Sequence, residues 1–480
     1  MGTARRIYKN TLYLGVAEIL SKALQFVVML YATRLLSQEH FGKFSFALSL
    51  SLIAIVLADL GINTLLIREL SRNKKLAGTY FANAFSIKIV LSFITYWIIV
   101  LTLNILNYPQ DTKNIVYIIW LFAILSTFTE LFYSIFRAFE MMFYDAFLKV
   151  LRMLLLAFVS LYVLFNGYGV VIFSYTFVIV ELIVVIIALF IALSNFIKLE
   201  TAIDISLIKS IIKRALPFGF AYVFGMIYFF IGSIMLSKLK GDVEVAIFSA
   251  AYNIALALLF IPTVYTNAIY PVLSRYYNQS KPELRLLYEK SFKYLYIIGL
   301  PISLGLFLLA DRIVFFLYGN RYSDSIIALQ IISLYLVIKF INFLLGIVLS
   351  SIDKQNKRMQ GQGLTAGLNI LLNLFLIPII GFVGAALSTF VTEVFLFVMY
   401  YSFVSKNWYF YNFLKILSKP IIAVFAMVLF IKFTSFGLII TILFSAIIYF
   451  LLLFILRTFD EEDYEIIRKV LKNGALQKDI

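Results

Sequence analysis

The sequence of 480 residues contains no cysteine and only one histidine. Without cysteine the chain can form no disulfide, thiolate metal site or thiol nucleophile. A single histidine excludes a multi-histidine metal centre, so neither a metal nor another cofactor is expected. A G-x-x-x-x-G-K-[ST] loop, which would bind the phosphates of ATP, is also absent. The absence of this phosphate-binding loop therefore excludes an ATP-driven pump.

Charged residues are scarce as well, at 14% of the chain, whereas hydrophobic residues make up 63% and aromatic residues 17%. The mean hydropathy is +0.98. A soluble domain has about 45–50% apolar and about 25% charged residues, so the composition predicts an all-α polytopic membrane protein. We attribute the net charge of +16 to loops that face anionic lipid headgroups, and not to binding of nucleic acid.

Apolar runs long enough to cross a bilayer as helices, about 20 residues each, occur fourteen times. They lie at residues 11–33, 43–66, 79–106, 114–136, 144–166, 169–196, 216–237, 244–273, 292–318, 324–351, 359–379, 382–404, 413–433 and 436–456. The first run is too long for a signal peptide and lacks a small-x-small cleavage site downstream. We interpret it as a retained first helix.

Lysine and arginine are distributed unequally between the connections. With the N-terminus in the cytoplasm, 30 of the 41 basic residues fall on cytoplasmic segments, eight fall on outer segments, and three lie within spans. Because cytoplasmic loops are enriched in basic residues, we expect a protein of the cell (plasma or inner) membrane with both termini in the cytoplasm.

Two polar elbows suggest an internal repeat. The first elbow is ATRLLSQEHFGKFSFA (32–47), and the second elbow is IMLSKLKGDVEVAIFSA (234–250). Phe44-Ser45 matches Phe248-Ser249 at an offset of 204, and Glu181 matches Glu393 at an offset of 212. Six helices in each half would place both halves in the same orientation, related by a pseudo-twofold axis along the membrane normal.

The repeat predicts two six-helix lobes and two additional C-terminal helices. The expected segments are an N-lobe at 1–197, a cytoplasmic amphipathic linker at 198–215, a C-lobe at 216–405, helices 13 and 14 at 406–456, and a cytoplasmic tail at 457–480. In the linker, apolar residues recur every four positions, which suits a helix that lies on the membrane surface. A solvated connection with some helix is the alternative.

Four stretches of the chain resemble a known family: RLLSQEHFGKFSFALSL (34–50), ADLGINTLLIREL (58–70), FFLYGNRYSDSIIALQIIS (315–333) and NLFLIPIIGFVGAALST (373–389). They are similar to polysaccharide-repeat flippases of the multidrug/oligosaccharidyl-lipid/polysaccharide exporter superfamily. The resemblance covers nearly the whole chain. It implies two lobes in a V, alternating access, a lipid-diphosphate-linked oligosaccharide as cargo, and no enzyme activity.

Polar residues inside the apolar runs are the candidate functional residues, because an ionisable group at mid-bilayer costs at least about 2.5–3.5 kcal/mol unless it faces a cavity or a partner. The candidates for binding the substrate are Lys22, Lys88, Lys339, Asn253 and Asn342 inside the runs, and Arg34 just beyond the outer end of the first run. The candidates for coupling or structure are Glu18, Asp59, Glu181 and Glu393. Lysine and arginine suit a diphosphate, which the resemblance implies as cargo.

Each candidate also has a structural interpretation. Glu18 and Lys22 are four residues apart and can pair on one helix face, and Lys88 can extend to the cytoplasmic surface. Arg34 can anchor to headgroups, and the matched positions of Glu181 and Glu393 favour shared packing contacts over cation coupling. We interpret Asp59 as part of an inner gate or a structural network.

Two other functions compete with a flippase. A cation-coupled drug or metabolite antiporter of the same superfamily would favour acidic residues such as Glu18, whereas helices 13 and 14 and the basic candidates argue for the flippase. A membrane polymerase or glycosyltransferase would need a sizeable outer loop, and the outer connections are too short.

The expected partners are the lipid-linked oligosaccharide, membrane lipids, and glycosyltransferases or a polymerase of the same pathway. We expect the transporter to be a monomer and to bind no nucleic acid.

The orientation can be tested by labelling single cysteines. Cysteine introduced at Asn166 or Ser435 should react in whole cells with a thiol reagent that does not cross the membrane, because both positions are expected outside. Cysteine at Gln477 should not react, and the natural chain gives no background labelling since it has no cysteine. The reverse labelling pattern would contradict the orientation.

Overall fold

The computed structural model describes residues 3–197 and 203–463. All regular structure in these two ranges is helical. In chain order the elements are α1 (Thr3–Leu35), α2 (Gln38–Asp59), α3 (Ile62–Arg72), η1 (Lys74–Leu76), α4 (Ala77–Ile105), α5 (Gln110–Ala138), α6 (Met142–Phe165), α7 (Gly169–Asn195), α8 (Ile205–Lys240), α9 (Asp242–Leu258), α10 (Phe260–Gln279), α11 (Lys281–Leu308), α12 (Ala310–Tyr318), η2 (Asn320–Tyr322), α13 (Ser325–Ser351), α14 (Gln355–Asn407), α15 (Leu414–Phe433) and α16 (Leu438–Ile455).

The protein is an all-α polytopic membrane protein. Thirteen segments of the described residues are long and apolar enough to cross a membrane. One of them is the 53-residue helix α14, whose backbone leaves the helical region at Ile380 and Gly381 (φ 56°). Pro378 precedes this kink, and proline lacks the N–H that a continuing helix needs. Counting the two halves of α14 separately gives the fourteen crossings expected from the sequence.

Two expected runs are interrupted in the structure. The run at 43–66 is broken because Leu60 and Gly61 both adopt left-handed backbone conformations, with φ of 45° and 81°. The chain beyond them forms the separate amphipathic helix α3, which buries Ile62, Leu65, Leu66 and Leu70. The run at 292–318 is divided at Leu309 into α11 and α12.

The chain divides into two compact units. Unit 1 comprises Met1–Phe260, Leu317–Ser325 and Gln362–Thr389, and unit 2 comprises Ile261–Phe316, Ile326–Gly361 and Phe390–Ile480. Unit 1 thus combines segments from both halves of the expected repeat. The lobes expected at 1–197 and 216–405 stay a prediction.

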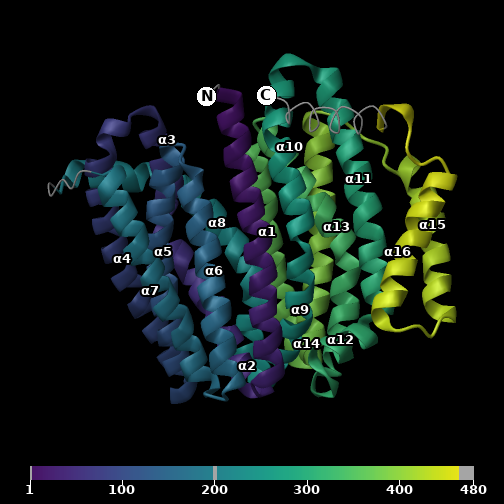
Figure 1. Cartoon of the computed structure of the whole chain (residues 1–480), viewed down its shortest axis with the longest axis horizontal. Helices are drawn as coiled ribbons and strands as arrows, with labels where there is room; N and C mark the ends of the chain where they lie inside the picture. Colours follow the sequence, from purple (N-terminus) through teal and green to yellow (C-terminus); the bar gives the residue numbers. More distant parts are fainter. Residues whose placement is uncertain (1–2, 198–202, 464–480) are drawn as a thin grey trace. The chain divides into compact units, whose positions relative to one another are not determined.

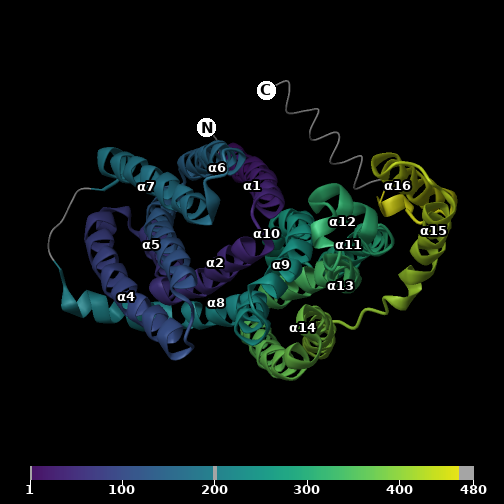
Figure 2. The same cartoon turned by 90° about the horizontal axis from the view of Figure 1, so that it is seen from below.

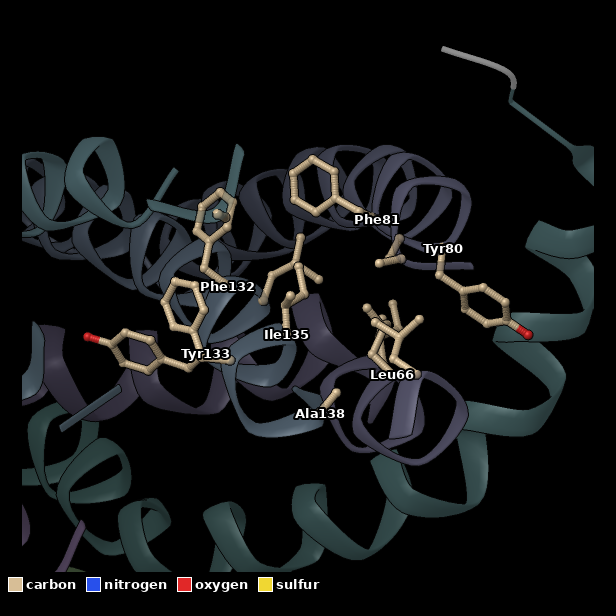
Figure 3. Close-up of a cluster of buried hydrophobic side chains, with 14 of the residues drawn as sticks. Leu66, Tyr80, Phe81, Phe132, Tyr133, Ile135 and Ala138 are labelled. Atoms are coloured by element: carbon tan, nitrogen blue, oxygen red, sulfur yellow. The ribbon is translucent and has the colours of Figure 1, made fainter. Parts of the chain in front are cut away.

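Unit 1 is assembled around α2. This helix packs against α5, α8 and α9 (Figure 2), while α1 packs along α6, and α5 packs along α7. A cluster of buried apolar side chains from α3, α4, α5, α7 and α8 fills one end of the unit. Figure 3 shows Phe81 of α4 with Phe132 and Ile135 of α5 in this cluster, with the hydroxyl of Tyr80 pointing away from it.

Helices α2 and α9 approach each other at backbone distance. A Cβ atom at Gly42 would overlap the carbonyl group of Asp242, the first residue of α9. Close packing of small residues stabilises helix pairs in a bilayer, where lipid is as apolar as the side chains and burial gives no hydrophobic gain. Gly42 and Asp242 belong to the first and second elbow, so the two elbows meet in the structure.

Unit 2 contains most of α10, α12 and α13, all of α11, the two ends of α14 up to Gly361 and from Phe390, and the C-terminal pair α15 and α16. Helices α15 and α16 pack on each other, and both contact α11 (Figure 1). The hydroxyl of Tyr449 on α16 donates a hydrogen bond to the carbonyl of Ile297 on α11 at 2.9 Å. On the other side of α11, Gly299 allows close packing against Val337 and Phe340 of α13.

The segment expected as a linker is largely helical. Asp204 caps α8 by accepting hydrogen bonds from the backbone N–H groups of Ser206 and Leu207, so residues 205–215 form the first turns of a 36-residue helix. The remainder of the linker at 198–202 and the tail from 464 onwards lie outside the described residues.

The close contact of Gly42 predicts a specific loss of stability. Gly42→Ala should destabilise the protein by about 1–3 kcal/mol, because the added methyl group forces α2 away from α9. The measurement is the thermal midpoint of the purified protein in detergent. Gly15→Ala on α1 is the matched control, since no atom beyond the adjacent residues and backbone of α1 lies within 4 Å of its Cβ position, and alanine favours a helix by up to about 1 kcal/mol. Equal midpoints for Gly42→Ala and the natural protein would contradict the packing argument.

Candidate functional site

Buried charge in the membrane-spanning helices identifies the candidate site. Ionised side chains are stable at this depth only when they are paired or hydrogen-bonded. In the described residues, two such groups centre on buried glutamates: Glu181 in unit 1 and Glu393 in unit 2.

Glu181 on α7 receives donors from two neighbouring helices. The hydroxyl of Thr129 on α5 donates to one carboxylate oxygen at 2.6 Å. Arg152 on α6 donates to the other oxygen at 3.5 Å. The arrangement ties the three helices together and compensates the charge of Glu181.

The ionic contacts continue along α5 and α6. Arg137 lies 2.6 Å from Asp145 and 3.3 Å from Glu130, and Lys149 lies 3.1 Å from the other oxygen of Asp145. Asp145 is completely buried, so its charge depends on these two cations. With Arg152, this makes a row of alternating charges inside unit 1.

Glu393 is held in a similar way in unit 2. Lys339 on α13 forms an ion pair with it, and the amide of Asn342 donates to its carboxylate at 2.8 Å and to its backbone carbonyl at 3.0 Å. Glu181 lies on the sixth crossing and Glu393 on the twelfth, and each accepts hydrogen bonds from the crossing two before it. This parallel supports the repeat expected from the sequence.

Lys88 does not reach the membrane surface. Its side chain is fully buried on α4, and the ammonium donates to Asp59 of α2 at 2.6 Å. The interpretation of Lys88 as a lysine that extends to the cytoplasmic side is therefore wrong. The reason is that Asp59 supplies a counter-charge at the same depth.

Glu69 connects α3 to α8. It pairs with Arg214, and Arg68 contacts the same carboxylate oxygen at 3.0 Å. Burial raises the pKa of Glu69, but the hydrogen bonds from Arg214 and Arg68 outweigh it, so the net pKa lies below the ordinary value of 4.5. The carboxylate thus stays ionised and joins the two helices at neutral pH.

The remaining candidates on α1 and α9 are less constrained. Lys22 is exposed, and within the described part of the chain no ion pair joins it to Glu18. Asn253 is half-buried on α9. Lys22 is thus the basic candidate whose ammonium is not already held by a carboxylate.

Arg34 lies in a set of hydrogen bonds between the first elbow and the segment 317–325 of unit 1. Arg34 donates to the carbonyl of Leu317. Gln38 donates to the carbonyl of Arg321 at 2.7 Å, and Arg321 donates back to the carbonyl of Leu36 at 3.1 Å. We call this set of three contacts the elbow lock.

The second elbow forms further contacts at the same end of unit 1. Lys238 donates to the carbonyl of Leu106 at 2.6 Å. Glu244 accepts the backbone N–H of Phe382 at 2.7 Å, which caps the second half of α14 immediately after its kink. Lys43 of the first elbow is buried between Glu39, at 2.5 Å, and Asp111.

Several of these residues were missed by reasoning from the sequence. Lys149 and Arg152 belong to the 30 basic residues expected from the sequence on cytoplasmic segments, but both lie inside α6, which begins at Met142. The spacing of Asp145, Lys149 and Arg152, at i, i+4 and i+7, is the signal for one charged helix face.

In the described residues, no group of three or more histidine, cysteine or acidic side chains could hold a metal ion.

Comparison with known sequences gives consistent matches. A family model described as "Polysaccharide biosynthesis protein" matches residues 7–277, and one described as "MatE" matches residues 217–375. The capsular polysaccharide biosynthesis protein CapF of Staphylococcus aureus is 26% identical over 419 residues, covering 83% of this chain and 99% of that protein. A candidate O-antigen transporter of Escherichia coli (strain K12) is 28% identical over 416 residues, covering 83% and 97%.

Solved structures show the same fold. The lipid II flippase MurJ in an inward closed conformation matches with a TM-score of 0.76 at 17% identity, covering 93% of this chain and 99% of that one. An inward-facing multidrug resistance MATE family transporter of the MOP superfamily matches with a TM-score of 0.62 at 17% identity, covering 80% and 95%.

The ion pair between Lys339 and Glu393 predicts a rescue experiment. Lys339→Met should lower stability by about 3–5 kcal/mol, because it leaves Glu393 buried without its cation. Adding Glu393→Gln should recover most of this loss, since the buried charge is then gone. Thermal midpoints in detergent measure both effects, with Lys432→Met at an exposed position as the control. Unchanged stability in Lys339→Met would show that Glu393 does not need its partner.

Proposed function

We propose, from the premise that the chain belongs to the polysaccharide biosynthesis protein family, that it is a flippase for lipid-diphosphate-linked oligosaccharides. It moves the oligosaccharide repeat unit from the cytoplasmic to the outer leaflet by alternating access, for assembly of a polysaccharide or glycan. The proposal includes no enzymatic step. Its cargo agrees with the names of the two relatives, which refer to a capsular polysaccharide and to O-antigen.

The observation that carries this proposal is the helix pair α15 and α16, which packs on α11 beyond the first twelve crossings. The fourteen-crossing fold matches the lipid II flippase over 93% of the chain, whereas the multidrug transporter matches 80%. A transporter for a lipid-linked cargo must accommodate a long apolar tail as well as a polar headgroup. Helices α15 and α16 supply an additional apolar surface for that tail, whereas an antiporter for small molecules has no such requirement.

The headgroup needs partners throughout its passage. Sugar hydroxyls and a diphosphate lose several kcal/mol each if they enter hydrocarbon without hydrogen bonds. A polar path inside the protein supplies those hydrogen bonds while the polyprenyl tail remains in lipid or along α15 and α16. The energy source is an ion gradient or the gradient of the substrate itself, since the chain has no nucleotide-binding loop.

Lys22 is the leading candidate for contact with the diphosphate. Its side chain is exposed, and its ammonium has no carboxylate partner in the described residues. Lys339 and Lys88 would each have to leave a buried carboxylate before binding a phosphate. Asn342 and Asn253 remain candidates for contacts with sugars, and Arg34 takes part in the elbow lock.

The elbow lock suits the outer gate of an alternating-access cycle. With both termini in the cytoplasm, the lock and the Glu244 cap lie at the outer ends of their helices. Arg34, Gln38 and Arg321 close this end of unit 1 through hydrogen bonds to backbone carbonyls. Such contacts can form and break without leaving a buried ion, so they suit a gate better than the ion pairs of Lys88 or Lys339 do.

The antiporter remains the second candidate because of Glu18. This carboxylate lies half-buried on α1, one turn before Lys22.

Glycosyltransferases and a polymerase of the same pathway are the partners that the flippase function requires, before and after translocation. A monomer is sufficient for the proposed cycle.

Loss of the gene tests the function directly. A deletion strain should accumulate lipid-linked oligosaccharide on the cytoplasmic leaflet and lose the surface polymer. Lys22→Met should reduce export in the complemented strain about tenfold or more at equal membrane level, since a hydrogen bond to a charged group contributes about 1.5–3 kcal/mol. Surface polymer per cell and probe accessibility of the lipid-linked precursor are the two measurements.

The control is Lys432→Met, which removes the same charge at an exposed position of α15. It should export normally. Normal export by Lys22→Met would remove Lys22 from the mechanism. If Glu18→Gln alone abolished both transport and its dependence on a cation, the antiporter would be favoured instead.

A further inference from the structure

A cavity of about 370 Å³ lies in unit 2, where α14 ends and the chain turns towards α15. Its lining consists of Phe397, Val398, Tyr401, Ser402, Ser405, Lys406, Phe410 and Phe413. Ligand pockets in proteins have volumes of about 300–1,000 Å³. The cavity is therefore large enough to hold part of a ligand, and none of the candidate residues described above lies in it.

The lining from α14 is a single stripe on one helix face. Its six residues follow the spacing i, i+1, i+4, i+5, i+8 and i+9 from Phe397 to Lys406. At 1.5 Å per residue, the stripe is about 13 Å long. It begins with aromatic and aliphatic side chains inside the spanning segment and ends at a lysine in the last helical turn.

The opposite wall is formed by the connection at 410–413 and is fixed in place. The hydroxyl of Tyr401 donates a hydrogen bond to the carbonyl of Tyr411 at 2.7 Å. The ring of Phe413 packs against Tyr401 and stacks on Phe292 of α11, with centroid distances of 5.4 Å in both cases. The walls are thus preformed, which lowers the entropy cost of binding.

Lys406 supplies the only charge in the lining. Its side chain is exposed, and in the described ranges it forms no ion pair. Lys406 lies at the mouth of an apolar concave stripe, so the charge and the apolar surface are presented to one molecule.

We propose that this cavity binds an anionic phospholipid, with one acyl chain along the stripe and the phosphate at Lys406. The single positive charge matches the single negative charge of a phosphodiester. A diphosphate would leave about one charge without a partner. The site lies in the cytoplasmic leaflet if the proposed orientation of the flippase holds, but binding itself does not depend on transport.

Such a lipid would connect the end of α14 to the first turn of α15. Phe410 and Phe413 belong to the connection between these helices, and the ring of Phe410 is largely exposed. An acyl chain in the stripe would cover this ring. The bound lipid would therefore set the position of the helix pair that distinguishes this fold from a twelve-helix transporter.

Native mass spectrometry of the purified full-length protein can test this site. Phosphatidylglycerol is the anionic probe and phosphatidylcholine the zwitterionic one. We expect phosphatidylglycerol to bind at least tenfold more tightly, and Lys406→Met to abolish this preference. Lys406→Arg should retain it, which separates loss of charge from loss of folding. Lys75→Met, an exposed lysine of η1, should have no effect.

Three outcomes would overturn the proposal. If the natural protein and Lys406→Met both bound phosphatidylglycerol and phosphatidylcholine equally tightly, the stripe would be an ordinary lipid-facing surface. Loss of preference in Lys75→Met would mean that overall charge, and not this cavity, selects the lipid. Displacement of phosphatidylglycerol by a polyprenyl diphosphate at equal concentration would assign the cavity to the cargo. None of these results depends on export, so they leave the proposed function to its own test.

Discussion

The structure depends on one constraint: the interior of a bilayer offers no water to a polar group. Backbone groups therefore bond within helices, and a charged side chain is stable only beside a partner. Glu181, Glu393 and Lys88 all satisfy this requirement through contacts to other helices. Because each pair joins residues far apart in the sequence, the charges that are costly individually also determine which helices are neighbours.

The contacts fall into two classes with different consequences. Ion pairs such as Lys339 with Glu393 are buried, so breaking one leaves a charge without compensation. The elbow lock consists of hydrogen bonds to backbone carbonyls near the helix ends, where water can replace either partner. The first class is suited to holding helices together throughout a transport cycle, and the second is suited to opening and closing.

Hydropathy predicted the number and order of the crossings, because an apolar run of about 20 residues has one stable form in a bilayer. It could not predict the break after Asp59, since Leu60 and Gly61 change the chain direction through backbone dihedrals that hydropathy does not record. The sequence identified Glu181, Glu393, Lys88 and Lys339 as costly charges. Their partners Thr129, Arg152 and Asp59 depend on contacts between distant segments, which one sequence does not reveal.

The kink of α14 has a consequence for how the protein is made. Only Ile380 and Gly381 depart from helical geometry between two crossing segments, so almost no hydrophilic chain separates them. During synthesis, the first segment has no polar loop that could be transferred across the membrane before the second segment emerges. The two segments must therefore enter the bilayer together as a hairpin. Asn369 and Asn373 already share a hydrogen bond at 2.8 Å along the first segment, which reduces the cost of carrying these amides into lipid.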